Sequence, residues 1–338
     1  MLSNRVGVLA LTALAPAIWG STYLVTTELL PPGRPLLAAV IRSLPAGLLL
    51  LAITRKLPQG SWWWRSLVLG GLNIGAFLAL LFIAAYRLPG GVAATVGAVQ
   101  PLLVAFFAAG LLGQQLSRRT LIAATAGIAG VALLVLRAQA RLDAVGLLAA
   151  FGGAVVMAVG VVLSKRWTST APLLLASTGW QLIAGGTLLL PVALLVEGPP
   201  PTTLTGQNLL GYGYLMLIGA ALSYALWFRG IWLLPATDVT FLTLLSPLVA
   251  TALGWVVLGE ELTGAQLVGA LVVLGALIAA QRPKPTDAGK PAATSEPGTD
   301  QWVPVGGASA NPRPRPKSHN VPARSPVPEP TDPQQPAR

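Results

Sequence analysis

The sequence predicts an all-α polytopic membrane protein, with ten transmembrane helices as two inverted five-helix repeats and a disordered C-terminal tail. Ten apolar segments approach the ~20 residues that a helix needs to cross the hydrocarbon core. The second half of the chain also repeats the first at fixed spacings. Beyond Gln281 the composition changes, and apolar clusters become rare. A β-barrel would instead show short segments of alternating hydrophobicity.

The ten predicted segments follow one another along the chain as Val6–Thr26, Pro35–Thr54, Ser66–Tyr86, Gly90–Leu112, Thr120–Leu136, Leu142–Leu163, Pro172–Val196, Leu209–Trp232, Thr237–Leu258 and Thr263–Gln281. The first of them begins like a cleavable signal peptide, with Arg5, an apolar stretch and Ala15-Pro16-Ala17. The apolar run continues past that point, and the repeat needs this segment. We therefore expect a retained first helix; cleavage would leave nine helices.

Matching residues define the repeat. Leu88-Pro89 matches Leu234-Pro235, Pro101 matches Pro247, and Leu112-Gly113 matches Leu258-Gly259, all at a spacing of 146. Further upstream the spacing becomes 139, which pairs Arg42 with Gln181. Five segments per repeat place the two halves in the membrane with opposite orientation, an arrangement typical of secondary transporters. The predicted domains are a first repeat over 1–137, a second over 142–281 and the tail over 282–338.

A formal charge of +11 and a pI near 10.9 could suggest nucleic-acid binding. The distribution of the charges favours the positive-inside rule instead. With both termini inside, the inner connections hold Arg5, Arg55, Lys56, Arg65, Arg118, Arg119, Lys165, Arg166 and Arg229, against Arg34, Arg87, Arg137 and Arg141 outside. We expect a multi-pass protein of the plasma (inner) membrane with both termini in the cytoplasm.

The tail holds about half of the 29 prolines of the chain. It cannot bury enough apolar area to offset the entropy of ordering, which indicates disorder. Its segment Pro312-Arg313-Pro314-Arg315-Pro316-Lys317 could be a polyproline ligand, could touch anionic lipid headgroups, or could be a solvated extension.

The chain has no Cys, which excludes disulfides and thiol chemistry. It has no phosphate loop of the G-x-x-x-x-G-K-[ST] type, so ATP is not the direct driver. No hydrolase motif is present either, and we expect neither an enzyme nor a bound cofactor or metal. The expected partners are a small-molecule substrate and membrane lipids, and the chain could form a homodimer.

Arg42 is the sharpest candidate for a functional side chain. It lies in the middle third of the second predicted helix, where a charge costs several kcal/mol unless it is solvated or paired. Arg42 could dock a carboxylate of the substrate. It could equally be structural, held by helix carbonyls or by Glu28.

Other polar and aromatic side chains at membrane depth could complete a binding site, which needs an apolar lining with a few directional polar groups. The predicted substrate-binding residues are Arg42, Gln181, Trp19, Asn73, Gln100, Tyr224 and Trp180. Ser223, Ser246, Tyr86 and Trp227 share the same character. Each alone could be an interhelical contact.

Pro101 and Pro247 lie at matched positions inside the fourth and ninth predicted helices. Proline removes a backbone hydrogen bond and clashes with the preceding turn, so each is expected to kink its helix. The paired kinks could be bending points for gating, or could only shape the bundle.

Trp19-Gly20-Ser21-Thr22-Tyr23, followed by Arg42, resembles the opening of the EamA branch of the drug/metabolite transporter superfamily. Pro101 to Gly113 and Pro247 to Leu262 each resemble the signature of that family between its fourth and fifth helices. The resemblance covers residues 6–281 and implies two inverted five-helix repeats around a central cavity.

Two positions depart from the pattern of the family. Gln114-Gln115 replaces an expected Glu, and Ala158 to Gly160 lacks a Trp-Gly-Ser equivalent. The resemblance and the repeat together predict a secondary transporter that exports small metabolites such as amino acids or drugs by alternating access. The alternative is a non-transporting polytopic membrane protein, either a lipid-modifying enzyme or a receptor-like scaffold.

Overall fold

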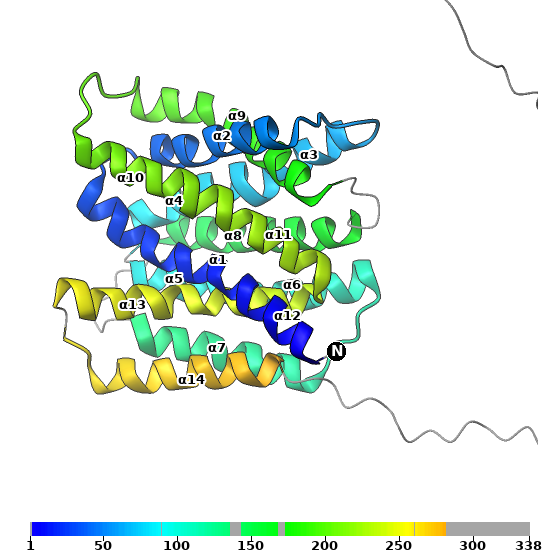
Figure 1. Cartoon of the computed structure of the whole chain (residues 1–338). Coiled ribbons are helices and arrows are strands. Elements are labelled where there is room, and N and C mark those ends of the chain that lie inside the picture. The colour runs from blue at the N-terminus through cyan, green and yellow to red at the C-terminus, as the bar shows by residue number, and fades with distance from the viewer. Residues whose placement is uncertain (1, 89, 136–142, 168–172, 260, 282–338) are drawn as a thin grey trace, which may run out of the picture. The chain divides into compact units, whose positions relative to one another are not determined.

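The computed structural model describes residues 2–88, 90–135, 143–167, 173–259 and 261–281, and across these ranges the chain forms helices and no strands (Figure 1). Nine helices within these ranges are long and apolar enough to cross a membrane. The first predicted segment lies in α1 (Leu2–Leu29), which has 28 residues and is not one of those nine. The predicted all-α multi-pass fold is confirmed. The predicted disordered tail, 282–338, lies outside the described residues.

The predicted segments correspond to helices of two kinds. The continuous ones are α1, α2 (Pro35–Thr54), α7 (Arg118–Val135), α8 (Ala144–Trp167), α9 (Leu174–Glu197) and α14 (Gly264–Gln281). The others are joined from shorter pieces: α3 (Trp62–Gly70) to α4 (Phe77–Arg87), α5 (Gly90–Gly97) to α6 (Gln100–Leu112), α10 (Gly206–Met216) to α11 (Ser223–Leu233), and α12 (Ala236–Phe241) to α13 (Leu245–Leu258).

The joints recur at the spacing of the sequence repeat. A π-helical segment, η1 (Gly71–Ala76), joins α3 to α4. A second π-helical segment, η3 (Leu217–Leu222), joins α10 to α11, and it begins and ends 146 residues after η1. Gly113 and Gly259, also 146 apart, end α6 and α13 with left-handed φ angles of 65° and 68°. The second half therefore repeats the local backbone of the first.

The two helices that contain Pro101 and Pro247 are both interrupted just before the proline. Ala98 and Val99 separate α5 from α6, and the 3₁₀ segment η4 (Leu242–Leu244) separates α12 from α13. Each proline lies in the first turn of the following helix, where its missing N–H costs little. The helix breaks lie where kinks were predicted, while the kinks themselves and a role in gating stay predictions.

Equivalent helices of the two repeats pack in pairs, α2 beside α9 and α7 beside α14, at opposite edges of the bundle (Figure 1). Glycines allow the close approach. A Cβ atom on Gly47 would lie 2.8 Å from the carbonyl oxygen of Gly179, and one on Gly269 would lie 2.7 Å from that of Gly130. Small residues at such contacts let helix backbones approach closely where the surrounding solvent is lipid.

Candidate functional site

The carbonyl oxygen of Gly219 receives two side chains from the other repeat. Arg42 donates to it from Nη2 at 2.9 Å, and Trp19 donates from Nε1 at 3.3 Å. Gly219 lies in the π segment η3, where the usual α-helical hydrogen-bond ladder is interrupted. The Nε atom of Arg42 is buried and has no hydrogen-bond partner within the part of the chain that the structure describes. Arg42 is therefore held by a helix carbonyl, one of the two structural contacts considered for it.

Aromatic rings surround this contact. The ring centroid of Trp19 lies 5.2 Å from that of Tyr224 and 5.2 Å from that of Trp227. Tyr224 in turn stacks on Phe228, with centroids 6.0 Å apart. Tyr224 and Trp227 are both buried. The structure thus brings together three of the predicted site residues, Arg42, Trp19 and Tyr224, on α2, α1 and α11.

A second polar group joins the repeats through buried side chains. Asn73, in the π segment η1, donates from Nδ2 to Oε1 of Gln181 at 3.2 Å and to Oγ of Ser164 at 3.2 Å. Gln181 donates from Nε2 to the carbonyl oxygen of Ser177 at 3.2 Å. The Oδ1 atom of Asn73 is buried, and none of the described residues forms a hydrogen bond with it. This group contains two further predicted site residues, Asn73 and Gln181.

These two groups are equivalent under the repeat. Gln181 is the counterpart of Arg42 at a spacing of 139, and Gly219 is the counterpart of Asn73 at a spacing of 146. In each group a polar side chain of the second helix of one repeat bonds to a π segment of the other. The same interhelical contact is therefore made twice, once between α2 and η3 and once between α9 and η1.

The two contacts differ in whether the π segment supplies a side chain. In the first group Trp19 is large, and Gly219 has no side chain. In the second, Asn73 supplies the side chain, and it lies against Gly160, where a Cβ atom would collide with Oδ1 of Asn73. Space beside Gly160, the counterpart of Ser21 at a spacing of 139, is thus already occupied, which gives a physical reason for the missing serine side chain at this place in the second repeat.

Two predicted site residues lie elsewhere. Trp180 donates from Nε1 to the carbonyl oxygen of Lys56 at 2.8 Å, and its ring centroid is 6.1 Å from that of Trp62. This tryptophan pair belongs to a separate apolar cluster of α3 and α9. Gln100 is buried at the start of α6, with no hydrogen-bond partner for its Nε2 atom. The side chain of Tyr86 lies outside the described residues.

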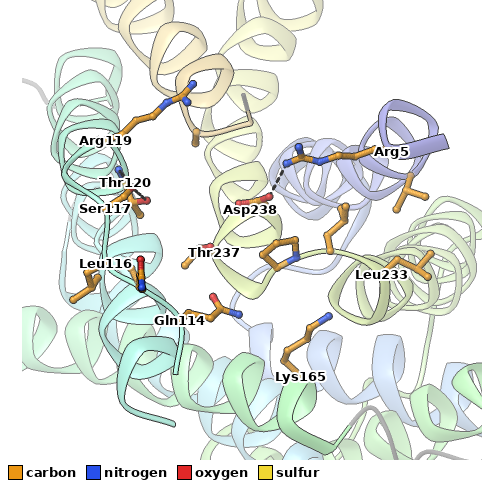
Figure 2. A pocket seen from close by; sticks show the side chains of 16 residues that line it. Arg5, Gln114, Leu116, Ser117, Arg119, Thr120, Lys165, Leu233, Thr237 and Asp238 are labelled. Atoms are coloured by element: carbon orange, nitrogen blue, oxygen red, sulfur yellow. Dashed lines mark hydrogen bonds and ion pairs between the residues drawn. The ribbon is translucent and has the colours of Figure 1, made fainter. Parts of the chain in front are cut away.

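A cavity of about 850 Å³ opens where several helix ends converge (Figure 2). Its wall is formed by residues of α1, α6, α7, α8, α11, α12 and α14 and by the loop that joins α6 to α7. All of these helix ends belong to the side that the charge distribution predicts to be cytoplasmic. We call this feature the inner cavity.

Charged side chains distinguish the inner cavity. Arg5 and Asp238 form an ion pair across it, with Nη2 and Oδ2 2.9 Å apart, drawn as a dashed line in Figure 2. Lys165 donates from Nζ to the carbonyl oxygen of Trp232 at 2.9 Å, near the end of α11. Arg119 lines the opposite wall. The charged side chains of the inner cavity are therefore predominantly cationic.

The seven predicted site residues are absent from the described residues that line the inner cavity. Their role in binding stays a prediction. From the sequence, Arg5 and Lys165 were predicted only to be positive charges of the inner connections. Neither was predicted to lie near Asp238. The available signal was that all three fall at predicted cytoplasmic ends of helices, although the sequence alone does not show which ends meet.

Comparisons with known proteins agree with this architecture. Residues 6–136 and 144–280 each match the EamA-like transporter family. The chain is 47% identical to Protein PecM of Dickeya dadantii over 268 residues, which cover 79% of this chain and 90% of that protein. It is 28% identical to a probable amino-acid metabolite efflux pump of Salmonella typhimurium over 293 residues, 82% of this chain and 94% of that protein.

A third relative, an uncharacterized inner membrane transporter of Escherichia coli named YedA, is 27% identical over 77% of this chain and 86% of its own length. A solved crystal structure superimposes on 82% of this chain and 97% of its own, with a TM-score of 0.71 and 22% sequence identity. At that identity the structural likeness shows the fold alone.

Proposed function

We propose that this chain, which belongs to the EamA-like transporter family, exports small metabolites such as amino acids or drugs across the plasma (inner) membrane. The observation that carries the proposal is the inner cavity, which is large enough for a small solute and is walled by helices of both repeats. Ligand pockets of proteins commonly fall in the range of ~300–1,000 Å³. The relative from Salmonella, described as a probable amino-acid metabolite efflux pump, supports this class of solute.

Alternating access is the mechanism that we propose. The inner cavity is open on the predicted cytoplasmic side, whereas α1 and α13 pack closely farther along α1. A Cβ atom on Gly20 of α1 would lie 2.6 Å from the carbonyl oxygen of Ser246 and 2.8 Å from Cβ of Val249. Because the repeats are oppositely oriented, exchanging their local packing would close the inner cavity and open an equivalent one outside.

The paired contacts at the π segments offer the repeats a means of such exchange. Arg42 with Gly219 and Gln181 with Asn73 occupy equivalent places but differ in chemistry. A contact that forms in only one of the two conformations would stabilise that conformation. Such a difference in interaction free energy is what shifts a conformational equilibrium. A direct contact of Arg42 with a substrate carboxylate is a separate part of the proposal, because Arg42 lies outside the lining of the inner cavity. It is supported by the buried Nε atom of Arg42, which has no hydrogen-bond partner among the described residues.

Counterflow in proteoliposomes tests the proposed function. Purified protein is reconstituted without ATP, the vesicles are loaded with one unlabelled amino acid at a time, and uptake of the labelled compound is followed. We expect transient accumulation above that of protein-free vesicles for at least one solute of a panel of amino acids and small drugs. Absence of exchange for every solute by folded protein would contradict a transporter and favour the receptor-like or enzymatic alternative.

A further inference from the structure

We propose that the inner cavity selects organic anions, that is, solutes that carry a free carboxylate or a comparable anionic group beside an apolar body. This inference rests on the proposed function and makes it more specific, because it assigns a solute class to the cavity. It uses Lys165 and Arg119 as the attracting charges, and neither residue was among those that the sequence singled out for binding.

The wall of the inner cavity carries an excess of positive charge. The described residues that line it include three cationic side chains, Arg5, Arg119 and Lys165, and one anionic side chain, Asp238. Arg5 and Asp238 neutralise each other through their ion pair at 2.9 Å. Lys165 and Arg119 then give the wall an excess of positive charge. Low-dielectric walls concentrate such a field inside a cleft and raise the local concentration of oppositely charged solutes.

Lys165 is the more important of the two. Its Nζ atom points toward the cavity in Figure 2 and donates to the carbonyl oxygen of Trp232, which carries no net charge. The residue is only partly exposed. Among the described residues no carboxylate pairs with Lys165, and a partly desolvated ammonium in that state gains stability when an anion approaches it. Capping the last carbonyls of α11 accounts for the position of Lys165 but does not neutralise its charge.

The apolar part of the wall supplies the second feature of the solute. Val8, Ala105, Leu233, Leu234, Pro235 and Ala280 line the same cavity. A small inorganic ion would leave this surface in contact with water, whereas a metabolite with a hydrocarbon or aromatic body would cover it. The combination fits an amphiphilic organic anion better than a neutral sugar or a cationic drug.

The absence of Cys from the chain permits a direct measurement of the cavity potential. Thr237→Cys places a single thiol in the cavity wall, and Thr203→Cys places a reference thiol on the exposed loop between α9 and α10. Each protein, in phosphatidylcholine nanodiscs, is modified with two methanethiosulfonate reagents, one with a sulfonate and one with a trimethylammonium group. For each thiol, the modification rate of the anionic reagent is divided by that of the cationic reagent. The ratio for Thr237→Cys divided by the ratio for Thr203→Cys reports the electrostatic potential of the cavity.

We expect this normalised ratio to favour the anionic reagent, and Lys165→Gln in the Thr237→Cys protein to lower it by about three- to tenfold. Gln keeps a donor for the Trp232 carbonyl but removes the charge. Arg166→Gln is the matched control, since Arg166 is adjacent, exposed and outside the cavity wall, and it should leave the ratio nearly unchanged. A ratio that favours the cationic reagent, or that does not respond to Lys165→Gln, would overturn the proposal.

Two further experiments distinguish a solute from a lipid headgroup as the bound anion. They also distinguish failure of this inference from failure of the proposed function. If lipid headgroups rather than solutes occupy the cavity, phosphatidylglycerol nanodiscs will abolish the preference for the anionic reagent, which contradicts a solute site. Protection of Thr237→Cys by 3-phenylpropionate but not by its neutral amide, 3-phenylpropionamide, supports the proposal, and equal protection opposes it. Because labelling does not require transport, failed counterflow with an intact anionic preference would refute the proposed function alone.

Discussion

Arg42 donates a 2.9 Å hydrogen bond to the backbone carbonyl of Gly219, which lies 177 residues away in the other repeat. The counterpart of Arg42, Gln181, bonds to the counterpart of Gly219, Asn73. Two π segments thus receive side chains from the second helix of the opposite repeat. π segments often occur at functional sites, and here they take part in two of the buried polar contacts between the two halves.

Arg42→Gln should destabilise the protein even without solute. The change removes the hydrogen bond of a charged donor to Gly219, which is typically worth ~1.5–3 kcal/mol. Arg42→Lys should retain part of that stability, because Lys still donates to a carbonyl but loses the planar fork. Thermal unfolding in detergent measures both effects. Arg118→Gln, at an exposed position, is the control and should unfold as the parent does.

The docking role of Arg42 is a separate expectation. If Arg42 also binds a carboxylate, Arg42→Gln will reduce the stabilisation produced by 3-phenylpropionate more than that produced by its neutral amide, 3-phenylpropionamide, which has no carboxylate. An equal loss for the two solutes would assign Arg42 a structural role only. An unchanged ligand response in a stable Arg42→Gln protein would remove this residue from the binding site.

Gly160→Ala should destabilise the second π contact. The added methyl group would collide with Oδ1 of Asn73, which is fully buried and cannot move without disturbing Gln181. Overpacking of this kind typically costs ~1–3 kcal/mol. Chemical denaturation should show the loss, and a second change, Asn73→Ala, should recover part of it by making room.

Gly275→Ala is the matched control, because this helical glycine has no atom within 4 Å of its hypothetical Cβ. Ala favours helix over Gly by up to ~1 kcal/mol, so Gly275→Ala should be neutral or stabilising. Equal stability of the Gly160→Ala and Gly275→Ala proteins would contradict the close contact between α8 and η1.

Trp180→Phe should affect stability without changing solute preference. The indole N–H bonds to the carbonyl of Lys56, and removing it should cost ~1 kcal/mol while the contact with Trp62 remains. Counterflow measured for a panel of solutes should show the same order of rates as the parent. A changed order would return Trp180 to the binding site, where its position in the sequence had placed it.

The sequence predicted the repeat well because proline and glycine recur at one spacing. Gly113 and Gly259 end helices in the left-handed conformation, and Pro101 and Pro247 follow helix breaks, so each leaves a local signature. The π segments left none. Their residues, Gly71–Ala76 and Leu217–Leu222, are mostly small and apolar like the rest of the helices, so no residue type distinguishes them in the sequence.

The site was only partly predictable for a similar reason. A polar side chain at membrane depth identified Arg42, but its partner is a backbone carbonyl of Gly219, which no side-chain pattern reveals. Trp180 was predicted to line the site as an aromatic residue at membrane depth, yet it packs in another cluster. Arg5 and Lys165 followed the rule for charged inner connections, which does not indicate which helix ends converge on a cavity.

We expect both termini in the cytoplasm, because positive residues are more frequent in the connections on that side. Reporter fusions after Arg166 and after Gln281 should give cytoplasmic signals, and a fusion after Arg141 an external one. Mass spectrometry of the intact N-terminus should find Leu2–Leu29 retained. The reverse pattern of fusions would place the inner cavity on the external side and contradict export from it.

Locking the inner cavity tests alternating access most directly. The double variant Gln114→Cys with Thr237→Cys carries two thiols in the wall of the inner cavity, both labelled in Figure 2. A bifunctional methanethiosulfonate reagent bridges them reversibly, and a methylating reagent modifies the same thiols without a bridge. We predict that counterflow by the bridged protein falls to the background of protein-free vesicles, exceeds it in the methylated protein, and returns when the bridge is reduced. Undiminished exchange by fully bridged protein would contradict the account.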